Sequence, residues 1–123
     1  MRGYLDRQGI GLAENGAWYL DRFGPNKMAA FDWSRSRPVI FLRPGATRVE
    51  VLHEIGHGLA YKRLGKSFYE SLDDPIRESI ASAFVTSRSS FTQRMTFERL
   101  LHEFGNMKAT IPADVLKKLK GIL

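Results

Sequence analysis

The segment from Thr47 to Gly65 constrains the fold most, because both of its ends carry signals that limit a helix. Thr47 and Glu50 fit a capping box, in which two side chains satisfy amide groups that a helix leaves free at its start. Two basic residues followed closely by Gly65 are typical of a helix end. We therefore expect a helix over residues 48–64, with a buried stripe of apolar residues at helical spacing: Leu52, Ile55 and Leu59.

Two strands are predicted ahead of this helix. Residues 27–33 and 39–43 contain apolar runs, and the polar segment between them favours an antiparallel hairpin. Pro38 and Pro44 flank the second run, and a proline cannot donate to a sheet ladder, so we place this strand at an edge of the sheet. Residues 17–23 suit either a short strand or a helical turn.

Helices are predicted for most of the remaining chain. Asp74-Pro75 suits the cap and first position of a second helix, and a capping box opens a third over residues 90–105. A short last helix follows Pro112 and ends near Gly121. The pattern predicts a single α+β domain over residues 1–123, with a small antiparallel sheet packed on the capped helix and on further C-terminal helices.

Composition is typical of a globular protein and limits its chemistry. The 123 residues suffice for one domain, with 43% hydrophobic and 26% charged residues. No apolar run is long enough to span a bilayer, and the first residues lack the apolar stretch of a signal peptide, so we expect a soluble domain. The net charge of +6 suits an anionic partner, but the charges are spread along the chain, which favours an ordinary solvated surface. Without cysteine, any transition-metal site must use histidines and carboxylates.

A metal-binding motif lies inside the capped helix. The run His53-Glu54-Ile55-Gly56-His57 has the H-E-x-x-H pattern of zinc peptidases. Residues four apart lie on one face of a helix, so both imidazoles can reach one ion, while Glu54 beside them can reach a metal-bound water. Gly56 and Gly58 each cost a helix interior about 1 kcal/mol relative to alanine, which indicates close approach by another backbone or by the metal site.

A catalytic zinc usually has a third protein ligand and a position for water. Glu78 on the predicted second helix is the best candidate, because small residues three and four positions further on would let the two helices approach. His102 is the rival, although it lies off the apolar stripe of the third predicted helix. Glu70 is a weaker candidate, and Asp73 and Asp74 are expected to cap the helix.

Other side chains are candidates for supporting roles. A developing oxyanion needs a hydrogen-bond donor, and Tyr61 and His102 are the candidate transition-state stabilisers, with Tyr69 and Arg77 as further ones. The predicted edge strand could pair with an extended substrate by β-augmentation, or serve as an ordinary core strand. Its residues are Val39, Ile40, Phe41 and Leu42.

These residues resemble the gluzincin metallopeptidases, in which an H-E-x-x-H helix is followed by a glutamate on the next helix. More narrowly, the chain resembles the zincin-like metallopeptidase toxin domains at the C-termini of bacterial polymorphic toxins. The likeness spans most of residues 4–90 and rests on the motif helix and on these further segments: Glu14-Asn15-Gly16, Tyr19-Leu20-Asp21, Phe31-Asp32 and Tyr61-Lys62-Arg63-Leu64-Gly65.

This resemblance implies a zinc-dependent endopeptidase with one Zn²⁺ per chain, held by His53, His57 and Glu78. Glu54 would act as general base, taking a proton from the zinc-bound water that attacks a peptide carbonyl. The resemblance also implies a domain of a larger secreted protein that acts on a protein or peptide substrate in the cytoplasm of a target bacterium. A cognate immunity protein would neutralise it.

Other functions are open on the residues alone. The basic charge suits a nucleic-acid or protein-binding module whose metal is structural or absent. Short regulatory peptidases that cleave phage-type repressors share the motif and the downstream glutamate. A zinc-dependent nuclease is a further alternative, but no phosphate-binding cluster is evident near His53, and nucleic acid is the less favoured partner.

Overall fold

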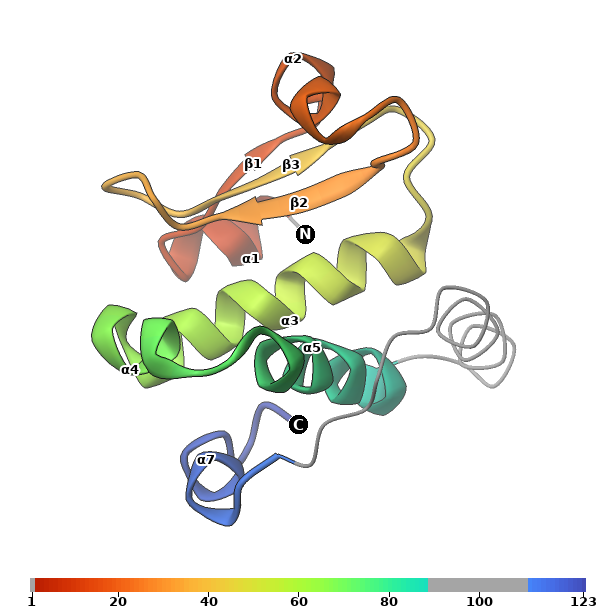
Figure 1. The fold of residues 1–123 in the computed structure, drawn as a ribbon. Coiled ribbons are helices and arrows are strands. Elements are labelled where there is room, and N and C mark those ends of the chain that lie inside the picture. The colour runs from red at the N-terminus through yellow and green to blue at the C-terminus, as the bar shows by residue number, and fades with distance from the viewer. Residues whose placement is uncertain (1, 89–110) are drawn as a thin grey trace.

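The computed structural model describes residues 2–88 and 111–123. The strands lie in the first third of the chain and the later part is helical, which confirms the predicted α+β class (Figure 1). In chain order the elements are α1 (Arg2–Arg7), β1 (Gly11–Ala13), α2 (Ala17–Leu20), the 3-10 helix η1 (Asp21–Phe23), β2 (Ala29–Asp32), β3 (Val39–Leu42), α3 (Arg48–Leu64), α4 (Lys66–Ser71), α5 (Asp74–Arg88) and α7 (Ala113–Lys118).

The sheet has the strand order β1-β3-β2 within the described residues. β2 and β3 form the predicted antiparallel hairpin, with Phe31 opposite Ile40. β1 pairs in parallel with the other side of β3, with Leu12 opposite Ile40. The sheet is therefore mixed, so the predictions of an antiparallel sheet and of an edge strand at Val39–Leu42 are wrong.

Pro38 and Pro44 do not prevent β3 from pairing on both sides, because both lie outside the four residues of the strand. A proline lacks the amide donor but keeps its carbonyl, and the Pro38 carbonyl accepts from the Gly11 amide at 2.8 Å. A Cβ at Gly11 would lie 3.2 Å from a Val39 methyl group, so glycine lets β1 pack closely on β3. β1 is only three residues long, too short for an alternating pattern to reveal it.

The sheet covers one side of α3, and α5 packs on another side (Figure 1). A Cβ at Gly58 would lie 3.0 Å from the Ile10 side chain, next to the sheet. A Cβ at Gly56 would lie 3.0 Å from Phe84 Cβ and 3.2 Å from Ala81 Cα, both on α5. The predicted close approach of another backbone is confirmed at Gly56, where α5 packs against α3, whereas at Gly58 the approaching groups are side chains next to the sheet.

The predicted ends of α3 are also confirmed. Thr47 and Glu50 form both halves of the capping box, and the helix ends before Gly65, whose positive φ of 87° suits glycine. α5 begins at Asp74, and the Asp73 carbonyl accepts from the amides of Ile76 and Arg77 in its first turn. Of the two residues expected to cap this helix, Asp73 therefore takes the capping position, and Asp74 is the first helical residue.

The apolar faces of the two helices largely match the predicted stripes. On α3, Ile55 and Leu59 are buried, and Leu52 is partly buried against the core. On α5, Ile80 and Phe84 are buried in the same core. This shared core holds the two helices in one fixed relation.

α2 packs on the face of the sheet opposite α3, where Tyr19 stacks on Phe41 (Figure 1). Of the two alternatives for residues 17–23, the structure shows the helical one. α7 confirms the predicted last helix, whereas the third predicted helix, over residues 90–105, lies outside the described residues. No helix of the described segments is both long and apolar enough to cross a bilayer.

Candidate metal centre

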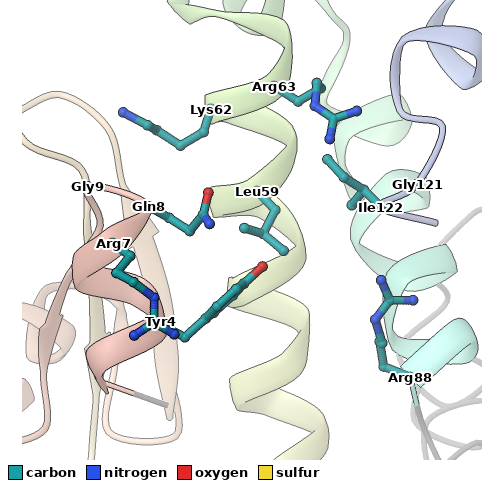
Figure 2. Close-up of a pocket in the computed structure, with 10 residues that line it drawn as sticks. All are labelled: Tyr4, Arg7, Gln8, Gly9, Leu59, Lys62, Arg63, Arg88, Gly121 and Ile122. Atoms are coloured by element: carbon teal, nitrogen blue, oxygen red, sulfur yellow. The ribbon is translucent and has the colours of Figure 1, made fainter.

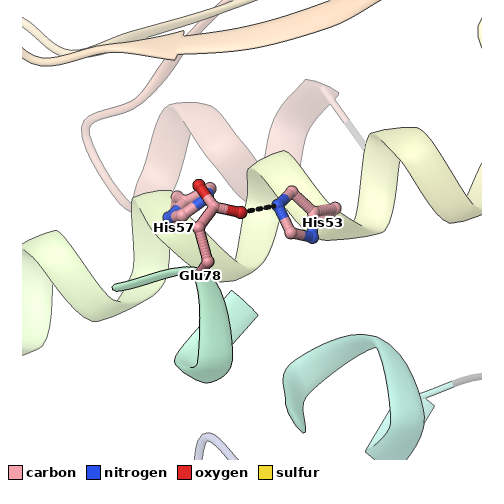
Figure 3. A group of neighbouring side chains, drawn as sticks. All are labelled: His53, His57 and Glu78. Atoms are coloured by element: carbon pink, nitrogen blue, oxygen red, sulfur yellow. Dashed lines mark hydrogen bonds and ion pairs between the residues drawn. The ribbon is translucent and has the colours of Figure 1, made fainter. Parts of the chain in front are cut away.

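The packing of α5 on α3 brings together three side chains from separate parts of the sequence. His53 and His57 lie on one face of α3, and Glu78 faces them from the first turns of α5 (Figure 3). Glu78 Oε2 lies 2.8 Å from His53 Nε2, and Glu78 Oε1 lies 3.2 Å from His57 Nε2. One ligand atom of each residue lies within 4.8 Å of the others, and no other group of three such side chains is found in residues 2–88 and 111–123.

The separations suit a divalent metal. Zinc holds imidazole nitrogens and carboxylate oxygens at about 2.0–2.2 Å, so two ligand atoms at a tetrahedral angle are about 3.4 Å apart. Both carboxylate–imidazole distances fall short of that value, while the ligand atoms of the cluster are up to 4.8 Å apart, so a small outward shift of the Glu78 side chain together with small rotations of the imidazoles would admit the ion. Two imidazoles and one carboxylate also match the donor set of catalytic zinc sites. The residues therefore fit the metal that the motif implies.

Burial and charge favour an ionised carboxylate at this centre. The Glu78 side chain is 46% exposed, whereas the rings of His53 and His57 are largely buried. Burial by itself would raise the pKa of the Glu78 carboxyl, but hydrogen bonds to the two imidazoles outweigh it and hold this pKa well below its ordinary value. The carboxylate is thus available as a charged ligand at neutral pH.

Tyr69 of α4 supports the second histidine. Its hydroxyl lies 2.9 Å from His57 Nδ1, while His57 Nε2 faces Glu78. Burial raises the pKa of the Tyr69 hydroxyl, so this group stays protonated and neutral. A histidine that binds metal through one nitrogen usually donates the N–H of the other to such a partner, which fixes the orientation of the ring.

Arg77 in turn supports Tyr69. Its guanidinium donates to the Tyr69 carbonyl at 3.1 Å and lies over the rings of Tyr69 and Trp33. The Asp74 carboxylate accepts from the same guanidinium, so the positive charge of Arg77 is balanced. The sequence suggested Tyr69 and Arg77 as further oxyanion donors, and this stays a prediction because both residues line the cavity of the metal centre. In the structure they also support His57 and the α4 backbone.

The three candidate ligands line an open cavity of about 580 Å³. Glu54 lies on the wall of this cavity and is only 7% exposed. Two residues of β2, whose edge away from β3 is unpaired among the described residues, also line the cavity. The further lining residues come from the segment that runs from α2 to just beyond β2 and from α4 and α5: Tyr19, Phe23, Lys27, Ala30, Phe31, Trp33, Tyr69, Asp74 and Arg77.

The remaining predicted site residues lie elsewhere. Tyr61 packs its ring on Phe31 and Tyr69 and does not line the cavity. Val39–Leu42 lies in the middle of the sheet and has no free edge in the described part of the chain, so the predicted substrate strand is wrong. His102 lies outside the described residues.

The other carboxylates considered as ligands do not join the cluster. Asp74 lines the cavity but pairs with Arg77, while Glu70 and Asp73 do not line it. The contact of Tyr69 with His57 depends on how the turn at Gly65 directs α4, and no local pattern in the sequence indicates it.

The geometry defines a candidate metal centre of two histidines and one glutamate on a small α+β domain. Comparison with models of protein families gives no match, and comparisons with curated proteins and with solved structures give none either. The function is therefore inferred from the site itself.

Proposed function

We propose that this chain is a zinc-dependent endopeptidase of the gluzincin type, with one Zn²⁺ per chain. The observation that carries the proposal is the convergence of His53 Nε2, His57 Nε2 and the Glu78 carboxylate on the wall of an open cavity. Three protein ligands beside solvent are typical of catalytic zinc sites, which keep one position for water or substrate. Bound zinc would supply a Lewis acid and lower the pKa of water at the site.

We assign the proton transfers to Glu54. Glu54 lines the cavity, lies on the same helix as both histidines and is not a member of the ligand cluster. A carboxylate in this position can take a proton from water and later give it to the leaving amine. Because Glu54 is almost fully buried, its interactions are weakened less by solvent than those of a surface carboxylate.

The unpaired edge of β2 supports an extended peptide as substrate. Within the described residues β2 pairs only with β3, and its residues Ala30 and Phe31 line the cavity. An extended peptide can add to such an edge through main-chain hydrogen bonds. Phe31 and Trp33 on the cavity wall then offer aromatic surface, so we infer a preference for apolar side chains near the cleaved bond.

The setting implied by the resemblance belongs to the same proposal. The domain would be delivered by a larger secreted protein, act in the cytoplasm of a target bacterium and be neutralised by a cognate immunity protein. Expression of the chain in bacterial cytoplasm should then arrest growth, and expression of the Glu54→Gln variant should not.

Glu54→Gln tests the chemistry directly. The variant should keep about one zinc per chain and lose about 10³-fold of the activity on an unfolded protein such as casein, because a general base contributes about 10²–10⁴-fold. Glu70→Gln, the same change on the exposed surface of α4, should keep both the zinc and the activity. Full activity of Glu54→Gln, or wild-type protein without zinc after purification free of chelators and histidine tags, would refute the proposal.

A further inference from the structure

A second cavity, of about 560 Å³, lies between α1, α3, the end of α5 and the C-terminal residues (Figure 2). It shares no described residue with the cavity of the metal centre. The residues that line it are Tyr4, Arg7, Gln8, Gly9, Leu59, Lys62, Arg63, Arg88, Gly121 and Ile122. We call it the cationic cavity because of the side chains considered next.

Four lining residues carry positive charge, and they come from three helices. Arg7 belongs to α1, Lys62 and Arg63 to α3, and Arg88 to α5 (Figure 2). None of the described lining residues is acidic. In the part of the chain that the structure describes, none of the four forms an ion pair with a carboxylate.

One acidic residue beside the cavity is engaged elsewhere, and the described contacts of Arg63 and Arg88 are with neutral groups. Asp6, next to Arg7, pairs with Arg37 at 3.0 Å. Arg63 donates to the Lys120 carbonyl at 2.9 Å, which is a neutral partner. Positive charges held around one concave space without an acidic partner repel each other, and a bound anion removes that cost.

We propose that the cationic cavity binds a small anion with two or more phosphate groups. Its volume lies in the range of about 300–1,000 Å³ that is typical of small-molecule sites. Guanidinium groups bind phosphate oxygens with paired hydrogen bonds, and an ammonium acts as a point charge. Tyr4 and Gln8 add a hydroxyl and an amide for the rest of the ligand.

The arrangement of the cations favours several phosphates in a compact molecule. The positive side chains come from α1, α3 and α5. A ligand with phosphates on several sides can contact all three helices better than a single phosphate can. A nucleic-acid backbone, in contrast, is followed by an extended groove or stripe of cations. The concave shape, with positive side chains from three helices around it, therefore indicates a small ligand with several negative groups.

This inference does not depend on the proposed peptidase activity. Successive residues of a helix are rotated by about 100°, so Leu59 in the cationic cavity lies about 200° around α3 from His57. An anion in the cationic cavity would contact helices α1, α3 and α5 together. It should therefore stabilise the folded chain whether or not a metal is bound.

Inorganic tripolyphosphate is the probe for this site. Calorimetric titration of the full chain at constant ionic strength should show about one site per chain, and Lys62→Gln/Arg88→Gln should weaken binding by about tenfold or more. Lys66→Gln/Lys117→Gln removes the same charge from exposed positions outside the cavity and should change the affinity by less than about twofold. Arg63 is left unchanged because it also holds the Lys120 carbonyl.

Further ligands identify the source of the phosphates and can overturn the proposal. Tighter binding of ATP than of tripolyphosphate supports a nucleotide, and tightest binding of inositol hexakisphosphate supports a phosphorylated polyol. No binding of any of these, or equal weakening by both double variants, overturns the proposal. Tighter binding of a short single-stranded oligonucleotide, lost in Lys62→Gln/Arg88→Gln, overturns it in favour of a nucleic-acid site. Arg7→Gln repeats the test from α1.

Discussion

The two cavities beside α3 differ in how their charges are balanced. In the metal cavity the Glu78 carboxylate faces His53 and His57, and the guanidinium of Arg77 is paired with Asp74. In the cationic cavity four positive side chains have no carboxylate partner among the described residues. One helix thus borders a site suited to a cation and a site suited to an anion, and the net charge of +6 by itself indicates neither.

Two glycines in the helices beside these cavities differ in how closely other groups approach them. On the metal side, a Cβ at Gly56 would lie 3.0 Å from Phe84 Cβ of the neighbouring helix. Gly3 of α1 is exposed, and a Cβ there would lie 3.8 Å from the Arg7 guanidinium of the same helix. The metal ligands therefore depend on a close helix contact at Gly56, whereas Gly3 can accept a methyl group.

Gly56→Leu should have the largest effect, because its side chain would push α5 and Glu78 away from the histidines. We expect the free energy of unfolding to fall by about 1–3 kcal/mol and zinc binding to be lost. Gly3→Ala, at an exposed glycine of α1, is the control and should leave stability unchanged or raise it by up to about 1 kcal/mol. Urea denaturation and metal analysis measure both effects. Normal zinc affinity in Gly56→Leu would show that close packing does not position Glu78.

Tyr69→Phe should have an intermediate effect that is confined to the metal side. It removes the hydroxyl that bonds His57 Nδ1 but keeps the ring. We expect zinc affinity to fall by about 10–100-fold, as for other partners of a metal-bound histidine. Tyr61→Phe removes a hydroxyl from a ring that packs against Phe31 and Tyr69, and it should leave zinc affinity unchanged. Equal losses in the two variants would contradict the role given to Tyr69.

Asp32→Asn should have the smallest effect. Asp32 balances the charge of Arg35, so the variant tests a paired cation against the unpaired cations of the cationic cavity. Burial would raise the pKa of the Asp32 carboxyl, but hydrogen bonds from Ser34 and Arg35 hold it below its ordinary value of 3.8. A group whose pKa is lowered by folding stabilises the protein above its unfolded pKa, and this contribution is lost as the pH falls through the folded value.

The variant should therefore be less stable by about 1 kcal/mol at neutral pH and lose less stability than the wild type below about pH 4. Asp114→Asn, on the exposed surface of α7, is the control and should keep the wild-type acid dependence. Denaturation curves between neutral and acidic pH make the comparison. Parallel curves for the wild type and Asp32→Asn would show that this carboxylate contributes nothing.

The sequence was most informative where the signals are local. The limits of α3 follow from Thr47, Glu50 and Gly65, which act within one or two turns of the helix ends. The grouping of Glu78 with the histidines was also predicted, because the small residues of the next helix indicate close approach.

Long-range pairing was not predictable in the same way. β1 is short and pairs in parallel with β3, which is distant in the sequence. The sequence therefore carries no periodic pattern that reveals β1 or the central position of β3. The contact of Tyr69 with His57 depends on the direction of α4. The cationic cavity collects Arg7, Lys62 and Arg88 from three helices that only the tertiary fold brings together.

A crystal structure of the zinc-loaded chain tests the central claim most directly. We predict one zinc bound by His53 Nε2, His57 Nε2 and a Glu78 carboxylate oxygen, each at about 2.0–2.2 Å, with a fourth position open to the cavity. Zinc bound by other residues, or a fourth protein ligand that closes the site, would contradict the account.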